Sequence, residues 1–159
     1  MKLDLDRLIV ESLGEFLSHV RITNWIGREN EAISLFAFGF LQKHIKPTQI
    51  GIEVAVAPSP NKGINSHVRK DLAIWPASDM NRFFPRPGPN EPLAVLEWKV
   101  HRKGFRSGES NQSDIKKLTE YCTDHPSSVG YAVWLNLSSV PVEIVVDRID
   151  SSGTRRLSC

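Results

Sequence analysis

Two apolar segments of this chain carry charged side chains where a β-strand is normally hydrophobic, and this pattern constrains the fold most. The first segment is 69–75, with Asp71 inside it, and the second is 93–100, which reads Leu-Ala-Val-Leu-Glu-Trp-Lys-Val. Successive side chains of a strand alternate between the two faces of a sheet, so Glu97 and Lys99 share one face. Burying an acid and a lysine costs free energy unless both have partners.

Asp71 could supply such a partner from a neighbouring strand. Two carboxylates and an ammonium group at one point make a site for a hard divalent cation beside a charge-stabilising lysine. The alternative is an ordinary hairpin with a glutamate and lysine ladder on a solvated face, where Glu-x-Lys at strand spacing is common. The residues alone leave both interpretations open.

The order of Asp71, a long connection and then Glu97-Trp98-Lys99 resembles the PD-(D/E)XK nuclease superfamily. The proline of the motif's name is absent, because a lysine precedes Asp71. The resemblance extends over about 24–137 through the order of expected elements: helix, three strands, helix, strand. It implies a restriction-endonuclease-like fold and a Mg²⁺-dependent nuclease that hydrolyses phosphodiester bonds of nucleic acid. It favours DNA over RNA as the substrate.

The resemblance also implies roles for single residues. Asp71, Glu97 and the backbone carbonyl of Trp98 would be metal ligands, for Mg²⁺ or for Mn²⁺ as a substitute. Lys99 would orient or deprotonate the attacking water and stabilise charge on the phosphate. Lys117 would be a catalytic residue from the following helix, with a solvated helix charge as the alternative. The other candidates on that helix are Gln112 and Lys116.

The superfamily often adds an acid from its first core helix, and Glu29 and Glu31 are the candidates here. At about 100° per residue, Glu29 falls on the same face as Ile33 and Phe36, whereas Glu31 falls nearly opposite. We therefore prefer Glu29 as a further metal ligand. The alternative is a helix-start acid favoured by the helix dipole. Glu53, inside the first expected strand, is an outer candidate.

Apolar periodicity and turn residues predict the element order α-α-β-β-β-α-β-β, an α/β fold with a central mixed β-sheet flanked by helices. The expected helices are 3–20, 28–44 and 113–124, and the expected strands are 49–57, 68–75, 93–101, 129–137 and 140–149. Strands 93–101 and 129–137 should be parallel, because a helical crossover joins them. Pro141 suggests an edge position for the last strand.

The chain has 159 residues, enough for one domain with a hydrophobic core. We expect a single nuclease-like domain over 1–159, with its core at about 24–150 and a frayed polar tail at 151–159. Trp98 points away from its two charged neighbours, so we expect it in the core beneath a helix.

The net charge is only +2, so nucleic-acid binding would depend on clustered cations and not on the total. Basic residues do cluster after the Glu97–Lys99 segment, before Asp71 and in the loop between them: His101, Arg102, Lys103, Arg106, Arg69, Lys70, Arg82 and Arg86. We expect them to rim one edge of the site, with solvated loop charges as the alternative.

Composition excludes several other classes of protein. Hydrophobic residues make up 40% of the chain, and no apolar run approaches the about 20 residues of a membrane helix. Asp4 and Asp6 lie where a signal peptide needs basic residues, so we expect a cytoplasmic protein without a membrane partner. Cys122 and Cys159 form no disulfide framework, and the five histidines lack the paired spacing of a zinc site.

A second interpretation keeps the fold but not the reaction. In it the chain is a nucleic-acid-binding or assembly subunit with a nuclease fold and without independent catalytic activity. A homodimer and a subunit of a larger DNA-processing complex both stay open, because the sequence carries no signature of an interface.

Overall fold

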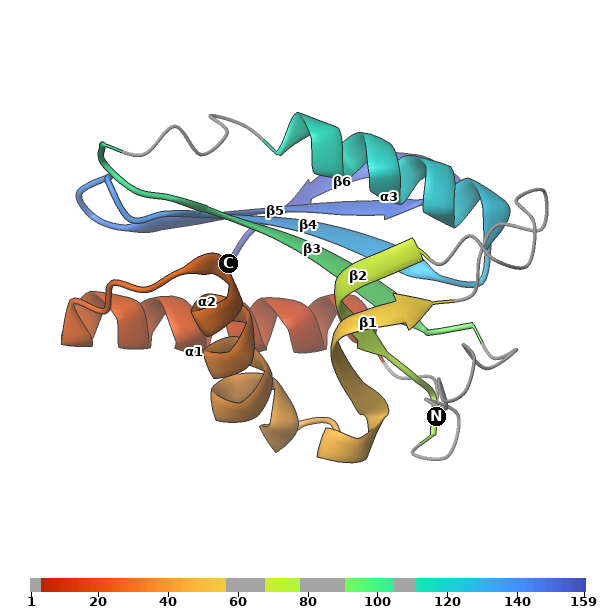
Figure 1. The fold of residues 1–159 in the computed structure, drawn as a ribbon, viewed down its shortest axis with the longest axis horizontal. Coiled ribbons are helices and arrows are strands. Elements are labelled where there is room, and N and C mark those ends of the chain that lie inside the picture. Colours follow the sequence, from red (N-terminus) through yellow and green to blue (C-terminus); the bar gives the residue numbers. More distant parts are fainter. Residues whose placement is uncertain (1–3, 57–67, 78–90, 105–110) are drawn as a thin grey trace.

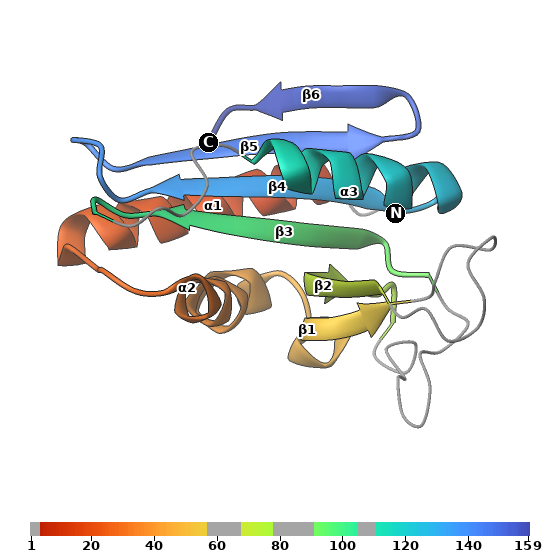
Figure 2. The same ribbon diagram turned by 45° about the horizontal axis from the view of Figure 1, so that its top comes forward.

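A computed structural model describes residues 4–56, 68–77, 91–104 and 111–159. Its centre is a six-stranded sheet in which the strands lie side by side in chain order, β1-β2-β3-β4-β5-β6. In Figure 1, α1 and α2 lie against one face of this sheet and α3 against the other, and the turned view of Figure 2 agrees. The predicted α/β architecture, a mixed sheet with helices on both faces, is confirmed.

Regular elements fill most of the described ranges. The strands are β1 (Ile50–Val56), β2 (Val68–Ile74), β3 (Ala94–His101), β4 (Val129–Asn136), β5 (Glu143–Asp150) and β6 (Gly153–Leu157). The α-helices are α1 (Leu5–Thr23), α2 (Glu29–Leu35) and α3 (Gln112–Asp124). A π-helical turn and a 3₁₀ turn extend α2, and a further 3₁₀ turn precedes β1: Phe36–Phe40, Leu41–Lys43 and Pro47–Gln49. No helix within these ranges has both the length and the apolar composition needed to cross a bilayer.

The strand pairing explains how the chain forms one sheet. β3 and β4 are parallel, as the helical crossover predicts, and α3 is that crossover. All other neighbouring strands in the sheet are antiparallel. Because the crossover helix returns over the face opposite to α1 and α2, the sheet is buried on both sides through its centre.

The larger core lies between the sheet and the first two helices. Helix α1 begins where the Asp4 carboxylate accepts a hydrogen bond from the backbone N–H of Arg7 at 3.1 Å. The apolar stripe of this helix is buried, and Phe16 packs edge-to-face on Trp98 with 5.7 Å between the ring centroids. The Trp98 ring also lies 5.3 Å from that of Phe36. The prediction that Trp98 is a core residue beneath a helix is confirmed.

Strand β1 changes the face that it buries at Glu53. Ile50 and Ile52 pack in the core under α1 and α2, whereas Val54 and Val56 pack in the smaller core under α3. Regular alternation would put all four side chains on one face. Glu53 has φ 47°, a left-handed conformation that interrupts the alternation and turns the strand over.

Strand β2 changes face at the same level. Leu72 and Ile74 pack in the larger core, whereas Val68 packs against the smaller one. The ladder pairs Ile52 with Leu72 and Val54 with Lys70, which places Asp71 beside the irregular residue of β1. The side chain of Lys70 therefore reaches the α3 side of the sheet, which regular alternation from Leu72 does not predict.

Two predictions about the ends of elements are wrong, and a third holds only in part. The polar tail 151–159 is not frayed, because β6 pairs with β5 through an antiparallel ladder. Pro141 does not mark an edge strand, because it precedes β5, which lies between β4 and β6. The helix expected over 28–44 is α-helical only to Leu35; it continues as a π-helical turn and then as a 3₁₀ turn that ends at Lys43.

Candidate functional site

The candidate site lies where β2 separates from β3. These strands pair at Leu72–Leu96, Ala73–Val95 and Ile74–Ala94, and the ladder ends there. On its other side β3 continues along β4 as far as His101. The second half of β3 therefore turns one edge of its backbone toward side chains and not toward a neighbouring strand.

Two carboxylates take the place of a strand at this edge. The backbone N–H of Trp98 donates to Oδ2 of Asp71 at 2.8 Å. The backbone N–H of Val100 donates to the carboxylate of Glu29, at the start of α2. The N–H and C=O of one residue in a strand point to the same edge, so the carbonyl of Trp98 also faces the side on which Asp71 lies. The Trp98 carbonyl and the two carboxylates thus lie along the same edge of β3.

Glu97 is buried and meets both an acid and a base. Oε1 of Glu97 lies 3.0 Å from Nζ of Lys70, and only 9% and 1% of these side chains are exposed. Burial raises the pKa of Glu97 to about 7; the positive charge of Lys70 opposes this rise, and the negative charge of Asp71 adds to it. A hydrogen bond between the carboxyl groups of Asp71 and Glu97 raises the pKa further. The two acids from neighbouring strands are therefore in direct contact.

Lys99 lies among carboxylates on the same side. Its Nζ is 3.7 Å from Oε1 of Glu29 and 3.6 Å from Oδ2 of Asp114. Partial burial lowers the pKa of Lys99, but the charges of Glu29, Asp114, Asp71 and Glu97 together outweigh burial and raise it. The ammonium group is thus charged at neutral pH. This favours a role in stabilising negative charge over a role as the base that deprotonates water.

Asp114 links two lysines at the start of α3. It is almost fully buried, and its Oδ1 lies 3.2 Å from Nζ of Lys117 while its Oδ2 faces Lys99. Lys117 itself is largely exposed and lines a pocket of about 380 Å³ together with Lys70, Asp71 and Glu97. We call this hollow the Glu97 pocket; its other charged lining residues are Arg69 and Glu120, and Tyr121 also lines it.

The structure distinguishes between the three other candidate acids, Glu29, Glu31 and Glu53. Glu31 accepts a hydrogen bond from the backbone N–H of Arg28 at 2.6 Å and so caps its own helix. Glu53 forms an exposed ion pair with Arg69 at 2.5 Å. Of the three candidates, only Glu29 contacts Lys99 and the open edge of β3.

The remaining predicted residues lie on α3, at or after the end of β3, or outside the described ranges. Gln112 and Lys116 are exposed on α3, and Arg102 and Lys103 directly follow β3. Three further basic residues of the expected rim lie outside the described residues: Arg82, Arg86 and Arg106.

The sequence placed Lys70 in the basic rim of the site, which is wrong because Lys70 is buried against Glu97, and it assigned no site role to Asp114. Regular alternation puts Lys70 on the opposite face from Asp71, yet both line the Glu97 pocket, at the level of the irregular residue Glu53 in β1. Asp114 did carry a signal, because an acid three residues before Lys117 lies next to it on a helix. Its burial depends on the packing of α3 against the sheet and is not readable from that spacing.

The donor set fits a single hard cation. Mg²⁺ is usually held by one or two carboxylates, with water and substrate phosphate completing its shell. Asp71 and Glu97 are in contact, and the carbonyl of Trp98 faces the same side. Within the described ranges no group of three or more His, Cys, Asp or Glu side chains is placed to hold a metal ion, so Glu29 lies beside the acid pair without completing such a group.

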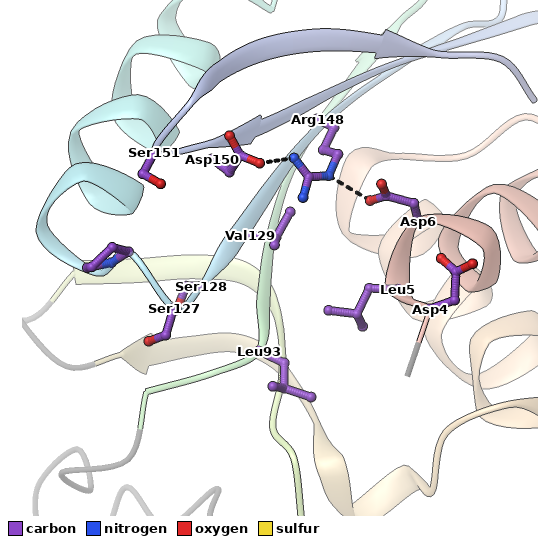
Figure 3. A pocket seen from close by; sticks show the side chains of 11 residues that line it. Asp4, Leu5, Asp6, Leu93, Ser127, Ser128, Val129, Arg148, Asp150 and Ser151 are labelled. Carbon is purple, nitrogen blue, oxygen red and sulfur yellow. Dashed lines mark hydrogen bonds and ion pairs between the residues drawn. The ribbon is translucent and has the colours of Figure 1, made fainter. Parts of the chain in front are cut away.

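A larger pocket of about 730 Å³ lies away from these residues, between the start of α1 and the end of β5 (Figure 3). Arg148 dominates it, with Nε 2.8 Å from Oδ1 of Asp6 and a second ion pair to Asp150. The hydroxyl of Tyr131 also donates to Asp6, at 2.7 Å. Arg155 of β6 also pairs with Asp6, so two positive charges balance the two carboxylates. The cluster joins α1 to β4, β5 and β6, and we assign it to the stability of the fold.

Comparisons with protein-family models, with curated proteins and with solved structures found no match for this chain. The resemblance to the PD-(D/E)XK superfamily therefore stays a prediction from the sequence motif around Asp71 and Glu97.

Proposed function

We propose that this protein is a metal-dependent nuclease of the PD-(D/E)XK type, with a restriction-endonuclease-like fold, that hydrolyses phosphodiester bonds of nucleic acid. The contact between the carboxyl groups of Asp71 and Glu97, beside the open edge of β3, carries the proposal. Two acids forced together in a half-buried place are costly unless a cation or a proton compensates them. The preference for DNA over RNA comes from the resemblance to the superfamily.

The chemistry assigns a role to each residue. Asp71, Glu97 and the carbonyl of Trp98 would hold Mg²⁺, which activates water and neutralises developing charge when it is bound. Lys99 keeps its proton, so it stabilises negative charge on the phosphate and orients water by hydrogen bonding. Glu29 and Asp114 hold the Lys99 ammonium from two helices and limit its movement.

Lys117 has a different role in this proposal. Its side chain is 60% exposed and lines the Glu97 pocket, so a phosphate group of the substrate can approach it from solvent. A flexible ammonium group suits electrostatic contact with a phosphate better than a fixed geometry. We therefore assign substrate binding to Lys117 and charge stabilisation at the reacting phosphate to Lys99.

Calorimetric titration with Mn²⁺ tests the metal site directly. We expect one Mn²⁺ per chain for the wild type, and binding at least about tenfold weaker for Asp71→Asn and for Glu97→Gln. Glu53→Gln is the matched control, because Glu53 is an acid of the neighbouring strand that pairs with exposed Arg69. A wild-type protein that binds no Mn²⁺, or acid variants that bind it as the control does, would contradict the proposal.

One observation favours the second candidate, a nucleic-acid-binding or assembly subunit with the same fold and without catalysis. Lys70 neutralises Glu97, and Lys99 lies between Glu29 and Asp114, so most charges of the site are compensated by the chain itself. Electrophoretic mobility shifts with duplex DNA, run beside a cleavage assay in Mg²⁺ and in Mn²⁺, separate the two. Binding without cleavage in either metal supports the second candidate.

A further inference from the structure

A lysine side chain occupies the inner end of the Glu97 pocket. Lys70 is 1% exposed, and its Nζ lies 3.0 Å from Oε1 of Glu97. The same ammonium group lies 5.0 Å from the centroid of the Tyr121 ring, on α3. A lysine so deeply buried is rare unless an acid compensates its charge, and Glu97 is the acid that does so.

The position of Lys70 conflicts with a metal bound to Glu97. A divalent cation and the ammonium group would compete for the electrons of one carboxylate. With no metal bound, the ion pair leaves Glu97 compensated. With a metal bound, Glu97 must divide its charge between two cations that repel each other.

We propose that Lys70 is a built-in counter-ion of Glu97, which holds the site together without metal and thereby weakens the binding of a divalent cation. This inference rests on the proposed function, in which Glu97 is a metal ligand. The change of face in β1 and β2 lies at the same level, since Glu53 is irregular and Lys70 pairs with the next residue of β1, Val54.

Two effects follow when the ammonium group is removed. Glu97 then has Asp71 as its nearest charged neighbour, so the protein without metal loses stability. A divalent cation binds more tightly, because it no longer competes with the Lys70 ammonium group for Glu97. Metal binding and folding become coupled, so the melting temperature depends strongly on metal concentration.

The test compares wild type with Lys70→Met, a change of similar length that removes the charge. We expect Mn²⁺ to bind Lys70→Met at least about tenfold more tightly in calorimetric titration. Adding Mn²⁺ at about 100 times its Kd should raise the Tm of this variant by about 5–10 °C. Without metal, its Tm should lie below that of the wild type.

Two control variants separate the specific effect from a general one. Lys116→Met removes an exposed lysine of α3 and should leave Mn²⁺ affinity unchanged. Lys70→Arg keeps a buried cation and should keep the weaker binding of the wild type. If Lys70→Met does not fold without metal, purification in Mn²⁺ followed by chelation should unfold it, which supports the proposal.

The outcomes distinguish this inference from the proposed function. Equal Mn²⁺ affinity in wild type and Lys70→Met overturns the inference alone, as does a Lys70→Met protein that stays unfolded in saturating Mn²⁺. No Mn²⁺ binding by wild type and by Lys70→Met overturns both. Binding by Lys70→Met but not by wild type supports the counter-ion role of Lys70 and contradicts a metal-dependent reaction in the native protein.

Discussion

The backbone N–H of Trp98 donates a hydrogen bond to Oδ2 of Asp71 at 2.8 Å, at the point where β2 separates from β3. The Asp71 side chain thus completes the edge of β3 and at the same time contacts Glu97. One residue therefore serves the fold through its hydrogen bond and the candidate metal site through its charge. Substitutions can separate these two contributions.

Asp71→Asn and Asp71→Ala should differ in stability but not in metal binding. Asparagine keeps an acceptor for the N–H of Trp98 and removes the negative charge next to Glu97, so its stability should equal or exceed that of the wild type. Alanine leaves this N–H without a partner, which costs about 1–3 kcal/mol. Urea denaturation measures the difference, and equal stability of the two variants would show that the hydrogen bond does not matter.

Much of the candidate site follows from the sequence because β3 is a regular strand. Alternation along it predicts that Glu97 and Lys99 share a face and that Trp98 enters the core. The position of Lys70 does not follow, because β2 changes face beside the left-handed residue Glu53 of β1. Non-glycine residues rarely adopt that conformation, so the pattern of β1 carries no sign of it.

The C-terminal strand β6 was not predicted from the sequence for another reason. The sequence of β6, Gly-Thr-Arg-Arg-Leu, has no alternation of apolar residues, and it is largely exposed at the edge of the sheet. Charged side chains are typical of edge strands, where they discourage pairing with other molecules. Its backbone ladder with β5, and the ion pair of Arg156 with the buried Asp147 at 3.1 Å, hold it in place.

Glu29 and Glu31 form a matched pair for testing the contact with Lys99. Glu29→Gln removes one of the carboxylates that hold the Lys99 ammonium, so we expect slower hydrolysis of DNA in Mg²⁺. Glu31→Gln keeps an acceptor for the N–H of Arg28, so neither stability nor rate should change. Initial rates with a fluorescent duplex substrate provide the comparison, and equal rates for both variants would remove Glu29 from the site.

The stability of the protein without metal should fall as pH rises toward neutrality. Burial raises the pKa of Glu97 from an ordinary 4.5 to about 7. Between these values the folded chain binds a proton that the unfolded chain has released, so the free energy of unfolding decreases with rising pH. The contribution of Glu97 is fully present below about pH 4.5 and is lost as pH rises through about 7.

Glu97→Gln should lack this pH dependence, because glutamine does not titrate. The difference in unfolding free energy between wild type and Glu97→Gln should therefore shift in favour of the variant from about pH 5 to about pH 8. Urea denaturation at several pH values in EDTA measures it. Parallel curves for the two proteins would show that Glu97 titrates near its ordinary pKa.

Basic residues that follow β3 should contribute affinity for DNA without selecting a sequence. A triple Ala variant of Arg102, Lys103 and Arg106 should bind duplex DNA more weakly, with a salt slope shallower by up to about 3. The loss should be similar for unrelated sequences, because phosphate contacts do not read bases. Fluorescence anisotropy at several salt concentrations measures the slope, and an unchanged slope would mean that DNA approaches elsewhere.

The most direct measurement of the central claim is cleavage of labelled DNA by the purified protein in Mg²⁺, compared with Lys99→Ala. Asp114 keeps its ion pair with Lys117 when Lys99 is removed, so the fold and Tm should change little. We expect cleavage by the wild type that EDTA stops, and a rate lower by about 100-fold or more in the variant. No cleavage by the wild type, or an equal rate for Lys99→Ala, would contradict it.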